Sequence, residues 1–510
     1  MRKTFLFSLV IAGIFCGFSC TPHKERKMDL PNIVVVYVDD LGYGDVGCYG
    51  ALGVKTPNVD FLAANGMQFT DAHCTAATCT PSRYSLLTGS YAFRNNAAIL
   101  PGDAPLLIRP GTPTLPGKLK DAGYTTAVIG KWHLGLGNGT PDWNSVLKPG
   151  PLEVGFDYSF IIPATLDRVP TVFVKNHKVY HRADKDSIFV SYTHKVGDLP
   201  IGLDHPEMLK VPADSQHSGT IVDSISRIGF MSGGQSAWWR DENISKTLAA
   251  QMTSFITDNK DKPFFLYYSL NDIHVPRAPN EQFVGKSTMG SRGDAIAEMD
   301  WQVGQVLQTL KKLNLQDNTL VVFTSDNGPV LDDGYGDSAV YLVGDHKPGG
   351  PFKGGKYSAY EAGTRVPTVV YWPGKVAAGI SHALVSQVDL YAAFAALTGQ
   401  ELEGKEAPDS YNMLDAWLGK DKKGRKTLLE ESYTMSLRDG KWKYIAPQTK
   451  PTPAWLKNKD IAVGLASFPQ LYNLEQDGGE TNNVMDQQQE QGTKMEKLLH
   501  QILDGDGSRF

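Results

Sequence analysis

Four runs of β-branched and aromatic residues recur along the chain, and a cluster of polar residues follows each of them. The runs cover residues 32–38, 125–129, 263–270 and 319–324. Continuous apolar runs of this length are typical of strands buried on both faces of a parallel sheet. A polar cluster comes directly after or close behind each run. The clusters are, in order, Asp39-Asp40, Lys131-Trp132-His133, Asp272-Ile273-His274 and Asp326-Asn327. Because functional groups of open α/β sheets gather beyond the carboxyl ends of strands, we expect these clusters to share one edge.

Segments with apolar residues at helical spacing separate the runs. They cover residues 56–65, 114–122, 241–259 and 294–313. In the third of them, Leu248, Met252, Phe255 and Ile256 recur three and four positions apart. The alternation of strands and helices predicts an α/β fold, with a large mixed, mostly parallel sheet sandwiched by helices.

The length of 510 residues favours one large domain and one smaller one. We place the large domain at residues 31–400 and a C-terminal subdomain at residues 401–510. Residues 136–240 are less regular, and we interpret them as insertions at the rim of a site, where loops often carry specificity. In the C-terminal part, residues 438–441 (Arg-Asp-Gly-Lys) predict a hairpin turn between short strands.

The N-terminus has the pattern of an export signal. Arg2 and Lys3 precede an apolar run at residues 5–18, which is shorter than the span of about 20 residues that crosses a membrane. We predict a signal peptide at residues 1–19 and a linker at residues 20–30. Cys20 resembles the lipidated residue of a bacterial lipoprotein, and we favour a lipoprotein of the periplasm or cell surface over plain secretion. The alternative is a signal peptide with an incidental Cys.

Composition excludes some classes of partner. Hydrophobic residues make up 41% and charged residues 21%, as in ordinary globular proteins. The net charge of −5 gives no basic face for a nucleic acid, so local cations must attract any anionic substrate. The five cysteines form neither a disulfide framework nor a zinc pattern, and whether Cys48 and Cys74 pair stays open.

The segment with the most chemical information begins at Cys79. It consists of Cys79-Thr80-Pro81-Ser82-Arg83 followed by residues 84–89 (YSLLTG). Pro81 suits the first turn of a helix and Thr80 can cap it, so Cys79 would lie just ahead of a helix N-terminus, where anionic chemistry is favoured. A lone Cys-x-Pro is more often a small buried residue before an ordinary helix.

These eleven residues resemble the signature of the sulfatase family, in which a maturating enzyme oxidises the Cys to formylglycine, the catalytic nucleophile. The resemblance extends from residue 31 to about residue 485 and includes four motifs in the family order. It looks closest to bacterial carbohydrate sulfatases of the arylsulfatase A and N-acetylgalactosamine-6-sulfatase type. It also implies a small antiparallel sheet closed by a strand at residues 471–474, with a final helix near residues 493–503.

Hard oxygen ligands follow the first and fourth runs. Asp39, Asp40, Asp326 and Asn327 form a set that suits Ca²⁺ or Mg²⁺ and not zinc. Alone, such pairs are more often strand-end caps or turns. The resemblance implies that these four residues and the converted Cys79 hold one Ca²⁺ ion.

The resemblance also implies the catalytic roles. The aldehyde made from Cys79 hydrates to a diol, one hydroxyl of which attacks sulfur while the other later expels sulfate. Arg83 holds the diol, His133 hydrogen-bonds it, and Asp326 accepts a proton. Lys131 and Lys356 bind the sulfate, and His274 protonates the leaving oxygen. Without the family pattern, Lys131 would be a surface residue and the two histidines structural.

Four further polar residues are candidates for sugar recognition at the rim: Asp167, Arg168, His217 and His346. For each of them, an ordinary polar residue of a loop is an interpretation at least as good. The leading hypothesis is an exported, calcium-dependent sulfatase that acts on a glycan, with sulfate at O6 of N-acetylgalactosamine or galactose in a glycosaminoglycan or mucin glycan. One alternative is a phosphonate monoester hydrolase or phosphodiesterase of the same superfamily. Another is an inactive glycan-binding surface protein.

Overall fold

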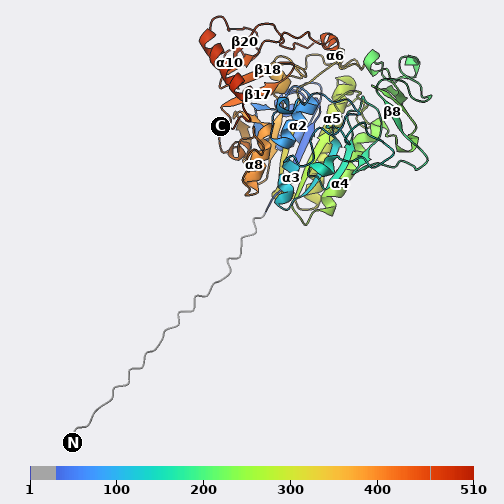
Figure 1. Cartoon of the computed structure of the whole chain (residues 1–510), viewed down its shortest axis with the longest axis horizontal. Coiled ribbons are helices and arrows are strands. Elements are labelled where there is room, and N and C mark those ends of the chain that lie inside the picture. The colour runs from blue at the N-terminus through green and yellow to red at the C-terminus, as the bar shows by residue number, and fades with distance from the viewer. Residues whose placement is uncertain (2–29, 460, 510) are drawn as a thin grey trace. The chain divides into compact units, whose positions relative to one another are not determined.

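The structure is a computed structural model, which describes residue 1, residues 30–459 and residues 461–509. Pro31–Phe510 form one compact unit (Figure 1). The predicted signal peptide and Cys20 lie outside the described residues. Among the residues that are described, no helix is both long and apolar enough to cross a membrane.

A ten-stranded mixed sheet forms the centre of this unit, in the order β15-β2-β14-β13-β1-β12-β4-β5-β6-β7. The neighbours β13, β1, β12, β4 and β5 run parallel, whereas β14 and β6 pair antiparallel on either side. The strands are β1 (Asn32–Val38), β2 (Met67–Phe69), β4 (Thr125–Lys131), β5 (Tyr158–Ile162), β6 (Val174–Lys175), β7 (Lys178–Val179), β12 (Phe264–Leu270), β13 (Thr319–Ser325), β14 (Thr368–Tyr371) and β15 (Gly379–Ser381). The predicted mixed, mostly parallel sheet is therefore confirmed.

The register of the central strands brings their carboxyl ends level. Val38 of β1 pairs with Leu270 of β12 on one side and with Ser325 of β13 on the other. Gly130 of β4 pairs with Ser269 of β12. The polar residues that follow the four strands therefore leave the sheet at one edge, as the strand pattern predicted.

Helices cover both faces of the sheet. On one face, Val34, Val36 and Val38 belong to the same core cluster as Leu248 and Met299. This face carries α1 (Pro57–Asn65), α4 (Ile244–Asp258) and α5 (Gly290–Lys312). On the other face, the Tyr37 hydroxyl lies 3.1 Å from Ser82 Oγ of α2 (Cys79–Thr88), beside α3 (Leu115–Asp121) and α8 (Leu390–Leu397). Alternate residues of β1 thus face opposite helical layers, which explains its unbroken hydrophobic run.

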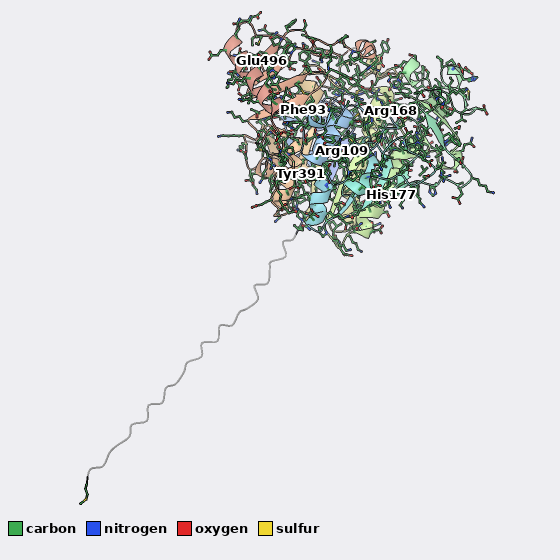
Figure 2. All side chains as sticks on the ribbon, in the orientation of Figure 1. Phe93, Arg109, Arg168, His177, Tyr391 and Glu496 are labelled. Atoms are coloured by element: carbon green, nitrogen blue, oxygen red, sulfur yellow. The ribbon has the colours of Figure 1, made fainter. Side chains whose placement is uncertain are left out.

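The segment that we interpreted as insertions forms short strands and turns. It contains β8 (Phe189–Ser191), β9 (Ile221–Val222), β10 (Ile225–Ser226) and β11 (Phe230–Ser232). Val169, Val222 and Met231 form a small core of its own. Arg168, labelled in Figure 2, comes from this segment. Two-residue strands β3 (Ala72–His73) and β16 (Val385–Ser386) and the short helices α6 (Ala339–Leu342), α7 (Glu361–Thr364) and α9 (Leu414–Trp417) lie in other connections.

The C-terminal part forms the predicted antiparallel sheet and helix. The sheet order is β17 (Thr427–Glu431), β18 (Met435–Asp439), β19 (Trp442–Ile445) and β20 (Gln470–Asn473), and α10 (Gln489–Asp504) packs on it. These elements lie together in Figure 1, at the red end of the colour bar. The hairpin turn between β18 and β19 lies where the sequence predicted it, with Gly440 at a φ of 57° that favours glycine.

A buried group of charges joins this small sheet to the rest of the molecule. Lys443 Nζ of β19 donates to Glu361 of α7 at 3.0 Å and lies 3.1 Å from Glu430 of β17. Arg438 of β18 also donates to Glu361, at 3.0 Å. The Lys443 and Glu361 side chains have no exposed surface, so neither charge can regain water if its partner is lost.

We expect Lys443→Met to lower the free energy of unfolding by about 3–5 kcal/mol, because two buried carboxylates would each lose one of their buried charged partners. Chemical denaturation followed by circular dichroism measures the change. Lys441→Met is the matched control, since that side chain is 42% exposed and its nearest carboxylate oxygen is 3.9 Å away. Equal stability of the two variants would contradict the role assigned to Lys443.

Candidate active site

A cavity of about 460 Å³ opens at the carboxyl edge of the central sheet. Among its lining residues are seven candidates from the sequence: Cys79, His133, Asp167, Arg168, His217, His274 and Lys356. Arg83, Lys131 and the four predicted metal ligands are fully buried and bonded to one another or to lining residues. The level strand ends therefore bring residues from four distant segments into one site.

Cys79 is the first residue of α2 and is almost fully buried, at 2% exposure. Its Sγ lies 3.2 Å from His133 Nδ1. His133 Nε2 donates to the Leu100 carbonyl at 3.0 Å, so Nδ1 is free to accept from the thiol. Burial raises the pKa of the Cys79 thiol, although Lys131 and Lys356 oppose the shift. Burial and the nearby Lys131 hold the pKa of His133 well below its ordinary value, so both groups are neutral.

The expected helix cap at Thr80 is wrong. Thr78 precedes the helix and makes no side-chain capping bond. Thr80 Oγ1 instead donates to the His133 carbonyl at 3.0 Å and so ties the Cys79 helix to the segment after β4. Thr80 is the second residue of α2, so it lies past the position from which a side chain caps a helix, and only the fold supplies its tertiary partner.

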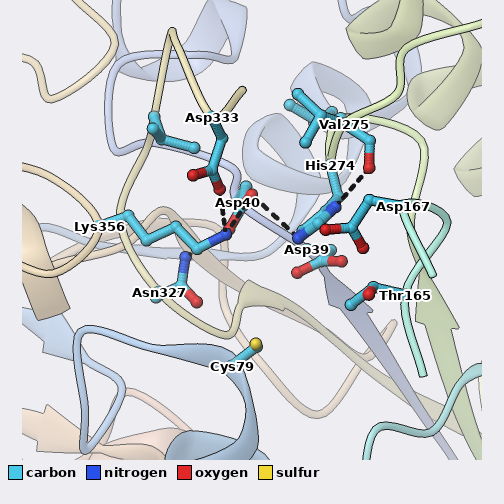
Figure 3. Close-up of polar contacts among 12 residues, drawn as sticks. Asp39, Asp40, Cys79, Thr165, Asp167, His274, Val275, Asn327, Asp333 and Lys356 are labelled. Atoms are coloured by element: carbon cyan, nitrogen blue, oxygen red, sulfur yellow. Dashed lines mark hydrogen bonds and ion pairs between the residues drawn. The ribbon is translucent and has the colours of Figure 1, made fainter. Parts of the chain in front are cut away.

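Three buried cations lie on three buried aspartates. Lys131 Nζ donates to both oxygens of Asp39, at 2.8 and 2.6 Å. An Arg83 amino group lies 2.7 Å from Asp326 Oδ2. Lys356 Nζ donates to Asp40 Oδ2 at 2.9 Å (Figure 3). In each pair, the carboxylate offsets part of the cost of removing its cation from water.

The oxygen atoms around Asp40 fit a hard divalent cation. Asp39, Asp40 and His274 present possible ligand atoms within 4.8 Å of one another. Asn327 Nδ2 donates to Asp40 Oδ1 at 2.7 Å, yet the buried Asn327 Oδ1 has no hydrogen-bond partner. Burial raises the pKa of Asp326 to about 7. Arg83 opposes this shift, and the neighbouring Asp39 and Asp40 add to it. A cation here would satisfy the orphaned oxygen and separate the crowded carboxylates.

His274 lies beside this oxygen cluster. Its Nδ1 donates to the Val275 carbonyl at 2.7 Å, and its Nε2 lies 3.9 Å from Asp40 Oδ2 (Figure 3). The backbone bond fixes the ring, so that Nε2 is the nitrogen available for proton exchange. Burial, together with the charge of Lys356, lowers the pKa of His274.

Three of the four rim candidates form a connected group. Asp167 Oδ1 accepts from Arg168 at 3.1 Å, and Asp167 Oδ2 lies 3.4 Å from His217 Nε2. His217 Nδ1 lies 2.7 Å from Asp214 Oδ1. Burial alone would lower the pKa of His217, but the hydrogen bonds to Asp167 and Asp214 raise it to about 9. His217 is therefore a cation at neutral pH.

The structure places the fourth rim candidate elsewhere. His346 Nε2 lies 2.8 Å from Asp45 Oδ1, and Arg292 donates to the same carboxylate. His346 is 5% exposed and is not among the residues that line the cavity. Sequence position could not separate it from the other loop histidines, because the partner that buries it lies about 300 positions away.

Comparison with protein families completes the assignment. The family model of the sulfatases matches residues 31–400. The chain belongs to the sulfatase family. It is a sulfuric ester hydrolase.

Relatives of this sulfatase share most of its length. An N-acetylgalactosamine-6-O-sulfatase of Bacteroides thetaiotaomicron is 47% identical over 492 residues, which are 96% of each chain. Human arylsulfatase A is 30% identical over 473 residues, which cover 89% of this chain and 83% of the human protein. A solved structure from work on the metabolism of multiple glycosaminoglycans by Bacteroides thetaiotaomicron has a TM-score of 0.91 at 47% identity, and the match covers 93% of this chain and 99% of that one.

Sequence reasoning missed several residues of the sulfatase's cavity. Asp333 accepts from Lys356 at 3.0 Å and is bonded to Tyr357 and Lys459. Tyr433, Trp455 and Lys459 also line the cavity, and all three come from the C-terminal part. Each lies in a loop or short turn without a motif, so no local signal in the sequence could have indicated them.

Proposed function

We propose that this sulfatase removes the 6-O-sulfate from N-acetylgalactosamine or galactose in a glycosaminoglycan or mucin glycan. The observation that carries the proposal is that two chemically different groups of residues meet in one cavity. The buried cations and the oxygen cluster are called the sulfate end here, and the Asp167, Arg168 and His217 group is called the sugar end. The similarity to an N-acetylgalactosamine-6-O-sulfatase supports this choice of sugar.

At the sulfate end, we propose that Cys79 is converted to formylglycine by a maturating enzyme and that one Ca²⁺ ion is held by Asp39, Asp40, Asp326, Asn327 and residue 79. When both are present, the cation would lower the pKa of a hydroxyl group of the hydrated residue 79, and that residue would supply the nucleophile for sulfur and the second hydroxyl for sulfate release. The donor set is all oxygen, which favours Ca²⁺ over zinc. Ca²⁺ is also preferred over Mg²⁺, which dehydrates reluctantly.

The chain's own residues then neutralise charge and move protons. Lys131 and Lys356 stabilise the negative charge that develops on the sulfate oxygens, which is usually the largest catalytic contribution. In its imidazolium form, His274 is held by the Val275 bond and gives its Nε2 proton to the departing sugar oxygen. His133 positions residue 79 through its Nδ1, and Arg83, one turn further along α2, donates to the Lys131 carbonyl and is assigned to hold the diol.

At the sugar end, Asp167 and Arg168 lie side by side as an acceptor and a donor. Such a pair is suited to two neighbouring hydroxyl groups of one pyranose ring. The protonated His217 supports Asp167, since its Nε2 lies 3.4 Å from Asp167 Oδ2. A site of this kind rejects a sugar that lacks the matching hydroxyl, because its buried polar groups would be left unpaired.

Two other functions remain as alternatives from the sequence. A phosphonate monoester hydrolase would use the same nucleophile and cations, so the ratio of rates on sulfate and phosphonate esters distinguishes it. An inactive glycan-binding protein would keep a plain thiol at Cys79, which the intact mass of that peptide from the native host reveals.

We also propose that the protein is exported to the periplasm or cell surface. Fractionation of the native host's cells tests this location.

A panel of mono- and disaccharides sulfated at single positions tests the proposal. We expect the matured protein to release sulfate from 6-O-sulfated N-acetylgalactosamine or galactose and not from the 4-O-sulfated isomers. Asp167→Asn should lower kcat/KM on the sugar substrate by on the order of 10²-fold, because a buried hydrogen bond to the sugar is lost. No release from any sulfated sugar or aryl sulfate would overturn the proposal.

A further inference from the structure

Three aromatic side chains line the cavity and take no part in the proposed sulfate chemistry, and we call them the aromatic wall. It consists of Tyr357, Tyr433 and Trp455. The Tyr357 and Trp455 rings lie 5.1 Å apart between centroids, and the Tyr433 and Trp455 rings 6.1 Å apart. Trp455 belongs to a 3-10 turn at Ala454–Asn458, and Tyr433 follows β17. The three rings therefore pack against one another, and Tyr433 and Trp455 come from the C-terminal part.

Trp455 lies nearer to solvent than the polar group that we assign to the sulfated sugar. Its exposure is 36%, whereas Asp167 and His217 are each 4% exposed. This exposed indole also lines the cavity, so its surface is accessible to a ligand there. Trp455 is thus placed to contact a group beyond the buried sugar.

The wall is fixed relative to the sulfate end. Lys459, four residues after Trp455, lies 3.1 Å from Asp333 Oδ1 and is 5% exposed in its side chain. The same carboxylate accepts from Lys356 at 3.0 Å and from the Tyr357 hydroxyl at 3.2 Å. A buried carboxylate that is shared by these three groups ties the Trp455 turn to the proposed sulfate-binding lysine.

A pyranose ring is the ligand that suits this surface. One face of such a ring presents C–H groups, which pack on aromatic rings, while its edge presents hydroxyl groups to polar partners. The cavity volume of about 460 Å³ lies within the range of sites for ligands larger than one small group. Continuity with the sulfate site argues for the same glycan chain as the occupant of both positions.

We propose that Trp455 and Tyr433 form a second sugar subsite, which stacks on the pyranose linked to the sulfated residue. This inference rests on the proposed function, because it requires a sulfated glycan in the cavity. It makes this enzyme selective for a sulfated sugar within an oligosaccharide over the free sulfated monosaccharide.

The test compares kcat/KM for a 6-O-sulfated monosaccharide and for the disaccharide that carries the same sulfated sugar. We expect the matured wild type to prefer the disaccharide, and Trp455→Ala to lower kcat/KM about tenfold on the disaccharide through KM alone. On the monosaccharide, Trp455→Ala should match the wild type. Trp455→Phe should recover most of the loss, since a ring is retained.

Phe468→Ala is the matched control, because Phe468 is a 58% exposed aromatic residue of the same C-terminal part that does not line the cavity. Equal losses on both substrates, or no loss on the disaccharide, would overturn the subsite. Failure of the proposed function gives a different result, since the wild type would then desulfate neither sugar. In that case, calorimetry of both saccharides with Cys79→Ala and with Cys79→Ala/Trp455→Ala still decides whether Trp455 binds the second ring.

Discussion

Cys79→Ser is expected to lower kcat by on the order of 10⁵-fold, the scale of losing a nucleophile that acts together with its partners. A serine has one hydroxyl group and lacks the second one that expels sulfate from the converted residue. The site around residue 79 would otherwise stay intact, because Lys131, Lys356 and Arg83 bind carboxylates and not the thiol. Sulfate release from the 6-O-sulfated sugar, measured by ion chromatography, gives kcat.

Cys48→Ser is the control for this experiment. Cys48 is half-buried, lies near Asp60 and is not among the residues that line the cavity. We expect its kcat to match that of the wild type, and both variants to retain the unfolding temperature within a few degrees. Turnover by Cys79→Ser at the wild-type rate would show that the reaction does not need the converted residue.

The second large effect is expected from metal removal. Chelation should lower kcat/KM by at least on the order of 10²-fold, and Ca²⁺ should restore it, because a cation stabilises the charge that develops at the reacting oxygens. Ca²⁺ at about 100 times its Kd should also stabilise the chelated protein by about 2.7 kcal/mol, since it binds only the folded state. Thermal unfolding with and without Ca²⁺ measures this second effect without any substrate.

Asn327→Ala makes this prediction specific to the proposed site. It removes the buried Oδ1 that has no hydrogen-bond partner, and it leaves all three carboxylates in place. We expect the Kd for Ca²⁺ to rise about tenfold or more, because the ion would lose one of its ligands. Asn65→Ala, at an exposed position at the end of α1, is the control. An unchanged Kd in Asn327→Ala would place the ion elsewhere.

The charges of the site bear on the proposed cation and on the sulfate ester together. The three buried aspartates are matched by Lys131, Arg83 and Lys356, so these six side chains together are close to neutral. A divalent cation added to this set gives an excess of positive charge, which a sulfate ester then offsets. Electrostatic stabilisation is strong here because the groups are buried, where charges interact across a low effective dielectric constant.

The sequence by itself determined the layout of the sheet and the segments that meet at its edge. The hydrophobic runs of β1, β4, β12 and β13 predicted buried parallel strands, and the structure confirms them. Their patterns are local, since a strand buried on both faces needs an unbroken apolar run. The polar residues directly behind those runs could be grouped for the same reason, because parallel strands end together.

Only the tertiary structure decided the remaining parts of the site. Thr80 bonds the His133 carbonyl from inside its helix, and His346 is buried against Asp45 and does not line the cavity. Asp333 and Trp455 reach the cavity from loops whose sequences carry no periodicity and no motif. The position of a loop side chain depends on distant packing partners, and these do not appear in any local pattern.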